Sequence, residues 1–177
     1  MNKRNINYVL VTIFSLALLT SCGGEKKKEE EKETIKIGAQ KEEEPVVEEA
    51  DSNVAEVVIV GDDTMRFDLS EIKVKAGQKV KLTLRHKGKM AVNVMGHNFV
   101  LLASGVDMVD FATKAASSQA TNYIPAGSEN DIIAHTNLIG GGQTATIEFD
   151  APAVGTYDFL CSFPGHYAIM KGKFIVE

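Results

Sequence analysis

From Val54 to the C-terminus, short runs of residues with high β-propensity alternate with turn-forming residues, and this pattern restricts the possible folds strongly. In the run 79–86, Val80, Leu82 and Leu84 alternate with mostly polar residues, as expected for a strand with one buried face. Six or more such strands predict an all-β domain over residues 54–177, a Greek-key sandwich or barrel. The six runs are residues 54–60, 71–77, 79–86, 144–150, 156–161 and 172–177.

One segment of this region departs from the strand pattern. Residues 104–120 are rich in alanine, and their apolar residues Val106, Val109 and Phe111 do not alternate with period two. We therefore expect one α-helix to be inserted between the strands.

The N-terminal residues 1–22 have the features of a secretory signal peptide. Lys3 and Arg4 precede an apolar run that is too short for a comfortable membrane span. The run ends in "LTSC", which resembles the lipobox of bacterial lipoproteins. This resemblance implies cleavage before Cys22 and lipidation of Cys22, and Gly23 in the next position permits export to an outer membrane. A signal peptide that is cleaved elsewhere is the alternative.

Residues 23–53 consist mainly of lysine and glutamate, and we expect them to form a charged, disordered linker. The linker contains six lysines and eleven acidic residues, whereas residues 54–177 contain eleven basic and thirteen acidic residues. The linker therefore carries a net charge of −5 and the domain a net charge of −2. A nearly neutral domain without a basic stripe gives no indication of nucleic-acid binding.

The two cysteines, Cys22 and Cys161, are not expected to pair with each other if Cys22 is lipidated. A lone thiol outside the cytoplasm is exposed to oxidation unless something holds it, and a metal ion would do so. Cys161 also begins the pattern C-x4-H-x3-M, which continues with His166 and Met170. Pro164 and Gly165 lie between them and predict a turn that brings the three side chains together.

Three chemistries could use a thiol, an imidazole and a thioether. A nucleophilic cysteine needs a cationic or helix N-terminal setting, and Cys161 instead ends an apolar strand. Zinc would accept the thiolate and two imidazoles but gains nothing from the thioether. A blue-copper site uses two histidines, one cysteine and a weak axial methionine, so it needs one more histidine from elsewhere in the chain.

Three motifs resemble those of the azurins, which are blue-copper cupredoxins, and they occur in the same order. These motifs are "VMGHNFVL" (94–101), "AHTNLIGGG" (134–142) and "CSFPGHYAIMKG" (161–172), and residues 61–68 and 85–98 fit the same family. The resemblance covers essentially all of residues 54–177. It implies a cupredoxin fold and one copper ion per chain, which cycles between Cu(I) and Cu(II).

The same resemblance assigns roles to individual residues. It implies that His97, Cys161 and His166 are equatorial copper ligands, that Met170 is the axial ligand, and that the carbonyl of Gly96 approaches from the opposite side.

Further roles are implied for residues around the ligands. Asn98 would bridge the two ligand loops, and the backbone amides of Asn98 and Phe163 would donate hydrogen bonds to the cysteine sulfur. His86 would lie near the copper without binding it, and His135 would lie on the surface.

An apolar collar around the exposed edge of His166 would receive redox partners, and electrons would pass through this histidine. The residues at the collar positions are Met65, Met90, Met95, Phe163, Pro164 and Ala168.

Two departures from the azurin pattern concern packing. Azurins usually carry a disulfide at positions that correspond here to Ala55 and Gly77, so we expect a less rigid end far from the copper. Phe99 stands where the family has a buried tryptophan, and the chain contains no tryptophan.

Together these observations predict a membrane-tethered electron carrier, not an enzyme, in the cell envelope of a Gram-negative bacterium. We expect its lipid anchor on the periplasmic side or the outer-membrane surface, and no small-molecule substrate. Expected partners are redox proteins such as c-type cytochromes or copper or haem reductases. A copper storage or delivery protein is the alternative, and a multicopper enzyme would need further histidine clusters.

Overall fold

The computed structural model describes residues 53–177. The predicted signal peptide, Cys22 and all but the last residue of the predicted linker lie outside this range. Within it, no helix combines the length and the apolar character needed to cross a membrane.

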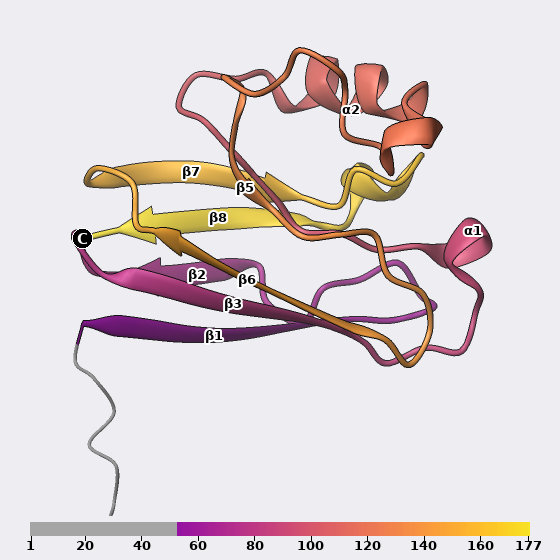
Figure 1. Ribbon diagram of the computed structural model, residues 1–177, viewed down its shortest axis with the longest axis horizontal. Helices are drawn as coiled ribbons and strands as arrows, with labels where there is room; N and C mark the ends of the chain where they lie inside the picture. Colours follow the sequence, from indigo (N-terminus) through magenta and orange to yellow (C-terminus); the bar gives the residue numbers. More distant parts are fainter. Residues whose placement is uncertain (1–52) are drawn as a thin grey trace, which may run out of the picture. The chain divides into compact units, whose positions relative to one another are not determined.

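The domain is built from two β-sheets, as the strand pattern predicts (Figure 1). The first sheet has the order β1-β3-β6, in which β3 runs parallel to β1 and antiparallel to β6. Its strands are β1 (Val54–Gly61), β3 (Lys79–His86) and β6 (Thr144–Asp150).

The second sheet has the order β2-β8-β7-β4-β5, and all its neighbouring strands are antiparallel except the parallel pair β2 and β8. The prediction of an all-β sandwich is therefore confirmed. The strands of this sheet are β2 (Glu71–Val74), β4 (Val100–Leu102), β5 (Ile132–His135), β7 (Gly155–Leu160) and β8 (Lys171–Val176).

Several element boundaries differ from the sequence-based expectation. The predicted strand 71–77 ends at Val74, because Gly77 takes a left-handed conformation (φ +78°) in the turn that leads to β3. Strands β4 and β5 are only three and four residues long, too short to give a clear period-two signal. Neither is among the predicted strands, although the family motifs include residues 100–101 of β4 and 134–135 of β5.

The inserted helix is present but shorter than predicted. Helix α2 spans Met108–Ala116, and a separate 3₁₀ turn, η1, follows at Gln119–Thr121. The carboxylate of Asp107 caps α2 by accepting hydrogen bonds from the N–H groups of Val109 and Asp110. Phe111 packs into the interior, whereas Val109 is 55% exposed.

Two hydrophobic clusters form the interior. The first lies between the sheets and includes Val80, Leu82 and Leu84, which are fully buried as their alternation predicts. The second lies beneath α2 and includes both Cys161 and Met170. The 125 described residues, with these two buried clusters, have the size and the hydrophobic core of an independently folding domain.

The two ends of the sandwich differ. Val54 begins β1 at the end where β8 brings the C-terminus, and Gly61 ends β1 beside His97. Eight strand residues separate these ends by about 25 Å. Helix α1 (Val92–Met95) and the 3₁₀ turn η2 (His166–Ala168) lie at the second end (Figure 1), which we call the loop end.

Candidate metal centre

Three side chains from distant parts of the sequence converge at the loop end. His97 follows α1, Cys161 follows β7, and His166 begins η2. Their donor atoms all lie within 4.8 Å of one another, and the residues are 0%, 0% and 3% exposed. The sulfur of Cys161 lies 3.6 Å from Nδ1 of His166 and 4.0 Å from Nδ1 of His97.

The loop from Cys161 to Met170 is closed by backbone hydrogen bonds. The N–H of Cys161 donates to the carbonyl of Met170 (2.9 Å), and the N–H of Met170 donates to the carbonyl of His166 (2.7 Å). Gly165 takes the left-handed conformation that the turn requires (φ +81°). The fully buried Met170 thus ends the loop in the same hydrophobic cluster as Cys161.

His97 is held by its backbone and by its ring. Its N–H and C=O groups exchange hydrogen bonds with Ile139 (both 2.9 Å), which fixes the chain next to the "IGGG" segment. Its Nε2 lies 2.8 Å from the carbonyl of Asp62, and a carbonyl can only accept, so Nε2 carries the proton. Nδ1 of the neutral ring is therefore left with a lone pair beside the Cys161 sulfur.

Asn98 joins the two segments that supply the histidines and the cysteine. Its Oδ1 accepts the N–H of Ser162 (2.9 Å), and its Nδ2 donates to the hydroxyl of Ser162 (2.8 Å). That hydroxyl in turn donates to the carbonyl of Tyr123 (2.8 Å). These buried hydrogen bonds hold His97 and Cys161 at a constant separation.

The environment of the sulfur suits a metal-bound thiolate. Burial raises the pKa of the Cys161 thiol to about 12, although hydrogen bonds from the backbone amides of Asn98 and Phe163 act in the opposite direction. Burial, together with the nearby His97 and His86, lowers the pKa of His166 to about 4. At neutral pH the metal-free site therefore holds uncharged groups, and a bound cation would supply the charge that stabilises a thiolate.

Gly61 and Gly96 allow the backbone to pack closely around this cluster. A Cβ atom on Gly61 would lie 2.7 Å from Cδ2 of His97, and one on Gly96 would lie 2.4 Å from the carbonyl oxygen of Val92. The carbonyl oxygen of Gly96 is 3.9 Å from the Cys161 sulfur. Gly96 directly follows α1, and the absence of a side chain at this position leaves room for the Val92 carbonyl of that helix.

The other two histidines are not in the cluster. His86 is buried and stacks on His97, with 4.2 Å between ring centroids and 14° between planes. Its Nδ1 accepts the N–H of Gly88 (3.0 Å), so its Nε2 donates to the carbonyl of Met95 (2.7 Å). His135 is exposed on β5.

The six predicted collar residues differ in exposure. Met90, Pro164 and Ala168 are exposed, Met65 and Met95 are half-buried, and Phe163 is buried against Tyr123 and the His166 ring. Sequence reasoning missed the exposed Val92 and Val94 on α1, next to Met90. It also missed the supporting roles of Asp62, Ser162 and Tyr123, because a backbone carbonyl and a serine hydroxyl leave no recognisable sequence signal.

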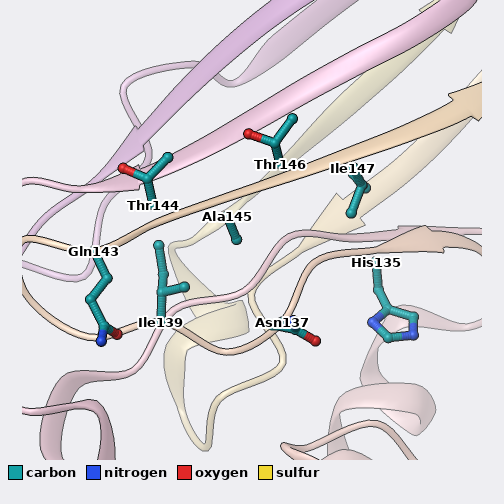
Figure 2. A pocket seen from close by; sticks show the side chains of 8 residues that line it. All are labelled: His135, Asn137, Ile139, Gln143, Thr144, Ala145, Thr146 and Ile147. Atoms are coloured by element: carbon teal, nitrogen blue, oxygen red, sulfur yellow. The ribbon is translucent and has the colours of Figure 1, made fainter.

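A surface groove of about 460 Å³ lies between β5 and β6 (Figure 2). Its lining residues are His135, Asn137, Ile139, Gln143, Thr144, Ala145, Thr146 and Ile147. The groove contains none of the three clustered donors.

The fold and the site define a class of protein: a small β-sandwich with a buried His-Cys-His cluster of the kind that binds copper or zinc. Similarity to known proteins identifies copper as the metal. Residues 54–177 match the family described as copper binding proteins, plastocyanin/azurin family. The chain belongs to this family.

Relatives of known structure and sequence support the same assignment. The chain is 41% identical to Azurin-1 of Alcaligenes xylosoxydans xylosoxydans over 120 residues, covering 66% of this chain and 92% of that protein. It is also 41% identical to Auracyanin-A of Chloroflexus aurantiacus over 115 residues, covering 64% of this chain and 68% of that protein. The solved structure of auracyanin A, a "blue" copper protein from that bacterium, superposes with a TM-score of 0.63 at 32% identity and covers 70% of this chain and 99% of that one.

Proposed function

We propose that this protein is a blue-copper carrier of single electrons, not an enzyme. His97, Cys161 and His166 would hold its copper, and the thioether of Met170 would be a further, weak ligand. The observation that carries this proposal is the buried cluster of one sulfur and two imidazole ring nitrogens within 4.8 Å. Membership of the plastocyanin/azurin family supports copper as the metal. Copper supplies the one-electron change between Cu(I) and Cu(II).

The protein's contribution is to keep the ligands still. Asp62 orients the His97 ring, Asn98 ties the ligand segments together, and the Cys161–Met170 loop is closed on itself. A site that keeps its geometry when the metal changes charge needs little reorganisation, and this favours fast electron transfer. The amide hydrogen bonds to the sulfur would tune the reduction potential.

Electron partners would dock at the loop end. Met90, Val92 and Val94 are exposed there, and Pro164 and Ala168 are exposed on the loop that carries His166. An apolar surface of this kind suits weak, transient contact with redox proteins such as c-type cytochromes or copper or haem reductases. Strand β1 begins with Val54 at the opposite end of the sandwich and reaches the loop end only at Gly61.

We also propose that the protein is a lipoprotein attached to a membrane of the Gram-negative cell envelope through Cys22, on the periplasmic side or the outer-membrane surface. The "LTSC" sequence after a short apolar run supports this, and the charged residues 23–53 would serve as a tether. Substituting Cys22→Ser should move the protein from the membrane fraction to the soluble fraction of fractionated cells. An unchanged membrane fraction would exclude anchoring through Cys22.

The copper assignment is tested by optical and EPR spectroscopy of the Cu(II)-loaded domain before and after ascorbate. We expect an intense blue sulfur-to-copper absorption band with narrow copper hyperfine splitting, and the band should bleach reversibly on reduction. Cys161→Ser should abolish the band, whereas His135→Ala should leave it unchanged because His135 lies outside the cluster. A pale Cu(II) spectrum, or copper readily lost to a mild chelator, would instead favour storage or delivery of the metal.

A further inference from the structure

The loop Lys87–Met90 connects β3 to α1 and carries the exposed Met90 at the loop end. We propose that Asp63 is a positioning residue for the copper centre, because its carboxylate fastens this loop to the turn that orients His97. This inference rests on the proposed function for its effect on copper, but its structural part can be tested without metal.

The carboxylate of Asp63 uses both oxygens on the loop. Oδ2 accepts the N–H of Lys89 at 2.8 Å, and Oδ1 accepts the N–H of Met90 at 3.3 Å. Gly88 lies so close that a Cβ atom there would be 2.0 Å from Oδ1 of Asp63. The glycine at position 88 therefore makes room for this carboxylate.

The "IGGG" segment holds the loop from a second direction. The N–H of Gly141 donates to the carbonyl of Met90 (2.8 Å), and the N–H of Gly142 donates to the carbonyl of His86 (2.9 Å). A Cβ atom on Gly141 would lie 2.5 Å from the carbonyl carbon of Lys89. The loop is thus fixed between Asp63 and the glycine segment.

Both segments that Asp63 joins also contact His97. The preceding residue, Asp62, accepts the His97 ring N–H through its carbonyl (2.8 Å), and the loop continues directly from His86, which stacks on the same ring. The Asp62 carbonyl also accepts the N–H of Met65 (3.1 Å), which closes the turn. At its start the loop is also attached to β1, because the N–H of Lys87 donates to the carbonyl of Gly61 (2.8 Å). Loss of the Asp63 carboxylate would release the turn from Lys89 and Met90, and the His97 hydrogen bond to Asp62 would weaken.

Two substitutions separate positioning from a simple charge effect. Asp63→Asn and Asp63→Ala remove the same negative charge, but asparagine keeps one acceptor oxygen and alanine keeps none. An effect of charge alone would be equal in both variants, whereas positioning predicts a graded effect. Asp68→Ala is the matched control, because the Asp68 carboxylate also binds a backbone amide, that of Val60 (2.7 Å), but does not contact the loop.

The first measurement is amide hydrogen exchange of the metal-free domain, followed by NMR. In Asp63→Ala, the exchange rates of the Lys89 and Met90 amides should rise roughly 10- to 100-fold, as expected for the loss of hydrogen bonds to a charged acceptor. Asp63→Asn should retain protection at one of the two amides. Asp68→Ala should leave both amides protected.

The second measurement follows the His97 Nε2 proton by NMR in the Cu(I)-loaded domain, together with the reduction potential. Exchange of this proton should become faster, and the potential should shift, in the order wild type, Asp63→Asn, Asp63→Ala. Equal shifts in the two variants, or an unchanged His97 proton despite a freed loop, would overturn the positioning role. Unchanged amide exchange in Asp63→Ala would overturn it as well.

The proposed function and the positioning role of Asp63 are overturned by different results. A wild-type domain without the blue absorption band overturns the proposed function itself. A blue wild-type domain whose Asp63 variants show no graded response overturns only this inference.

Discussion

At the scale of single residues, the cluster of His97, Cys161 and His166 depends on neighbouring groups that contribute none of its three donor atoms. Asp62 orients the His97 ring through a backbone carbonyl, and Asn98 connects the two ligand segments through Ser162. Phe99, which the azurin resemblance aligns with the family's tryptophan, is fully buried and packs against Phe159 with 5.2 Å between ring centroids. These hydrogen bonds and this ring contact restrict the movement of the segments that carry His97 and Cys161.

Asn98→Ala tests the bridge between the ligand segments. The substitution removes both hydrogen bonds to Ser162 and leaves a buried N–H group without its acceptor. We expect the free energy of unfolding of the metal-free domain to fall by roughly 2–4 kcal/mol. Urea denaturation measures this loss, and Asn137→Ala, at an exposed position, should change the free energy by less than about 0.5 kcal/mol. Similar losses in both variants would show that the bridge adds little.

At the scale of elements, α2 covers the hydrophobic cluster that contains Cys161 and Met170. Phe111, Ala112 and Ala115 are the buried residues of this helix, and Asp107 caps its first turn. The helix has nine residues and would be marginal in isolation, so its stability depends on this cap and on the packing of its buried face.

Asp107→Ala should therefore destabilise the domain by about 1 kcal/mol, within the usual range of roughly 0.5–2 kcal/mol for a lost N-cap. Asp107→Asn should keep most of the wild-type stability, since asparagine also caps helices well. Asp110→Ala is the charge-matched control, because Asp110 lies in the same first turn. If Asp110→Ala costs as much as Asp107→Ala in urea denaturation, helix-dipole charge rather than capping explains the effect.

At the scale of the whole molecule, the sandwich separates its two tasks. The strands carry the core, and β1 begins and β8 ends at the same end of the sandwich, whereas α1 and the loops lie at the other end (Figure 1). The cluster of His97, Cys161 and His166 lies at this loop end. Among the described residues no disulfide is present, and Cys161 is a free, buried cysteine. The lower rigidity expected near Ala55 and Gly77 stays a prediction.

Copper should act as a cross-link at the loop end. Ligand binding to the folded state at a free concentration a hundred times the dissociation constant adds about 2.7 kcal/mol of stability. For a domain of this size that corresponds to a rise in Tm of roughly 10 °C. Thermal unfolding with and without Cu(I), under anaerobic conditions, measures the shift, and Cys161→Ala should lose most of it. An equal rise in Cys161→Ala would mean that copper binds elsewhere.

The chain's local patterns were sufficient to predict its all-β class, and together with the family motifs they named the candidate ligands. Alternation in 79–86 predicted a strand with a buried face, and the spacing of Cys161, His166 and Met170 predicted a metal loop, because both depend on residues close together in sequence. The family motifs placed His97 beside them, and the cluster of His97, Cys161 and His166 agrees with that expectation.

Only the tertiary structure decided which distant groups support the cluster. The Asp62 carbonyl, the Ser162 hydroxyl and the Asp63 carboxylate act on segments 20 or more residues away in the chain, and their roles exist only once the strands have brought those segments together. The structure also decided that Val109 faces solvent and that β4 and β5 pair. Short-range periodicity is sufficient to predict secondary structure, but hydrogen bonds between loops depend on the packing of the whole sandwich.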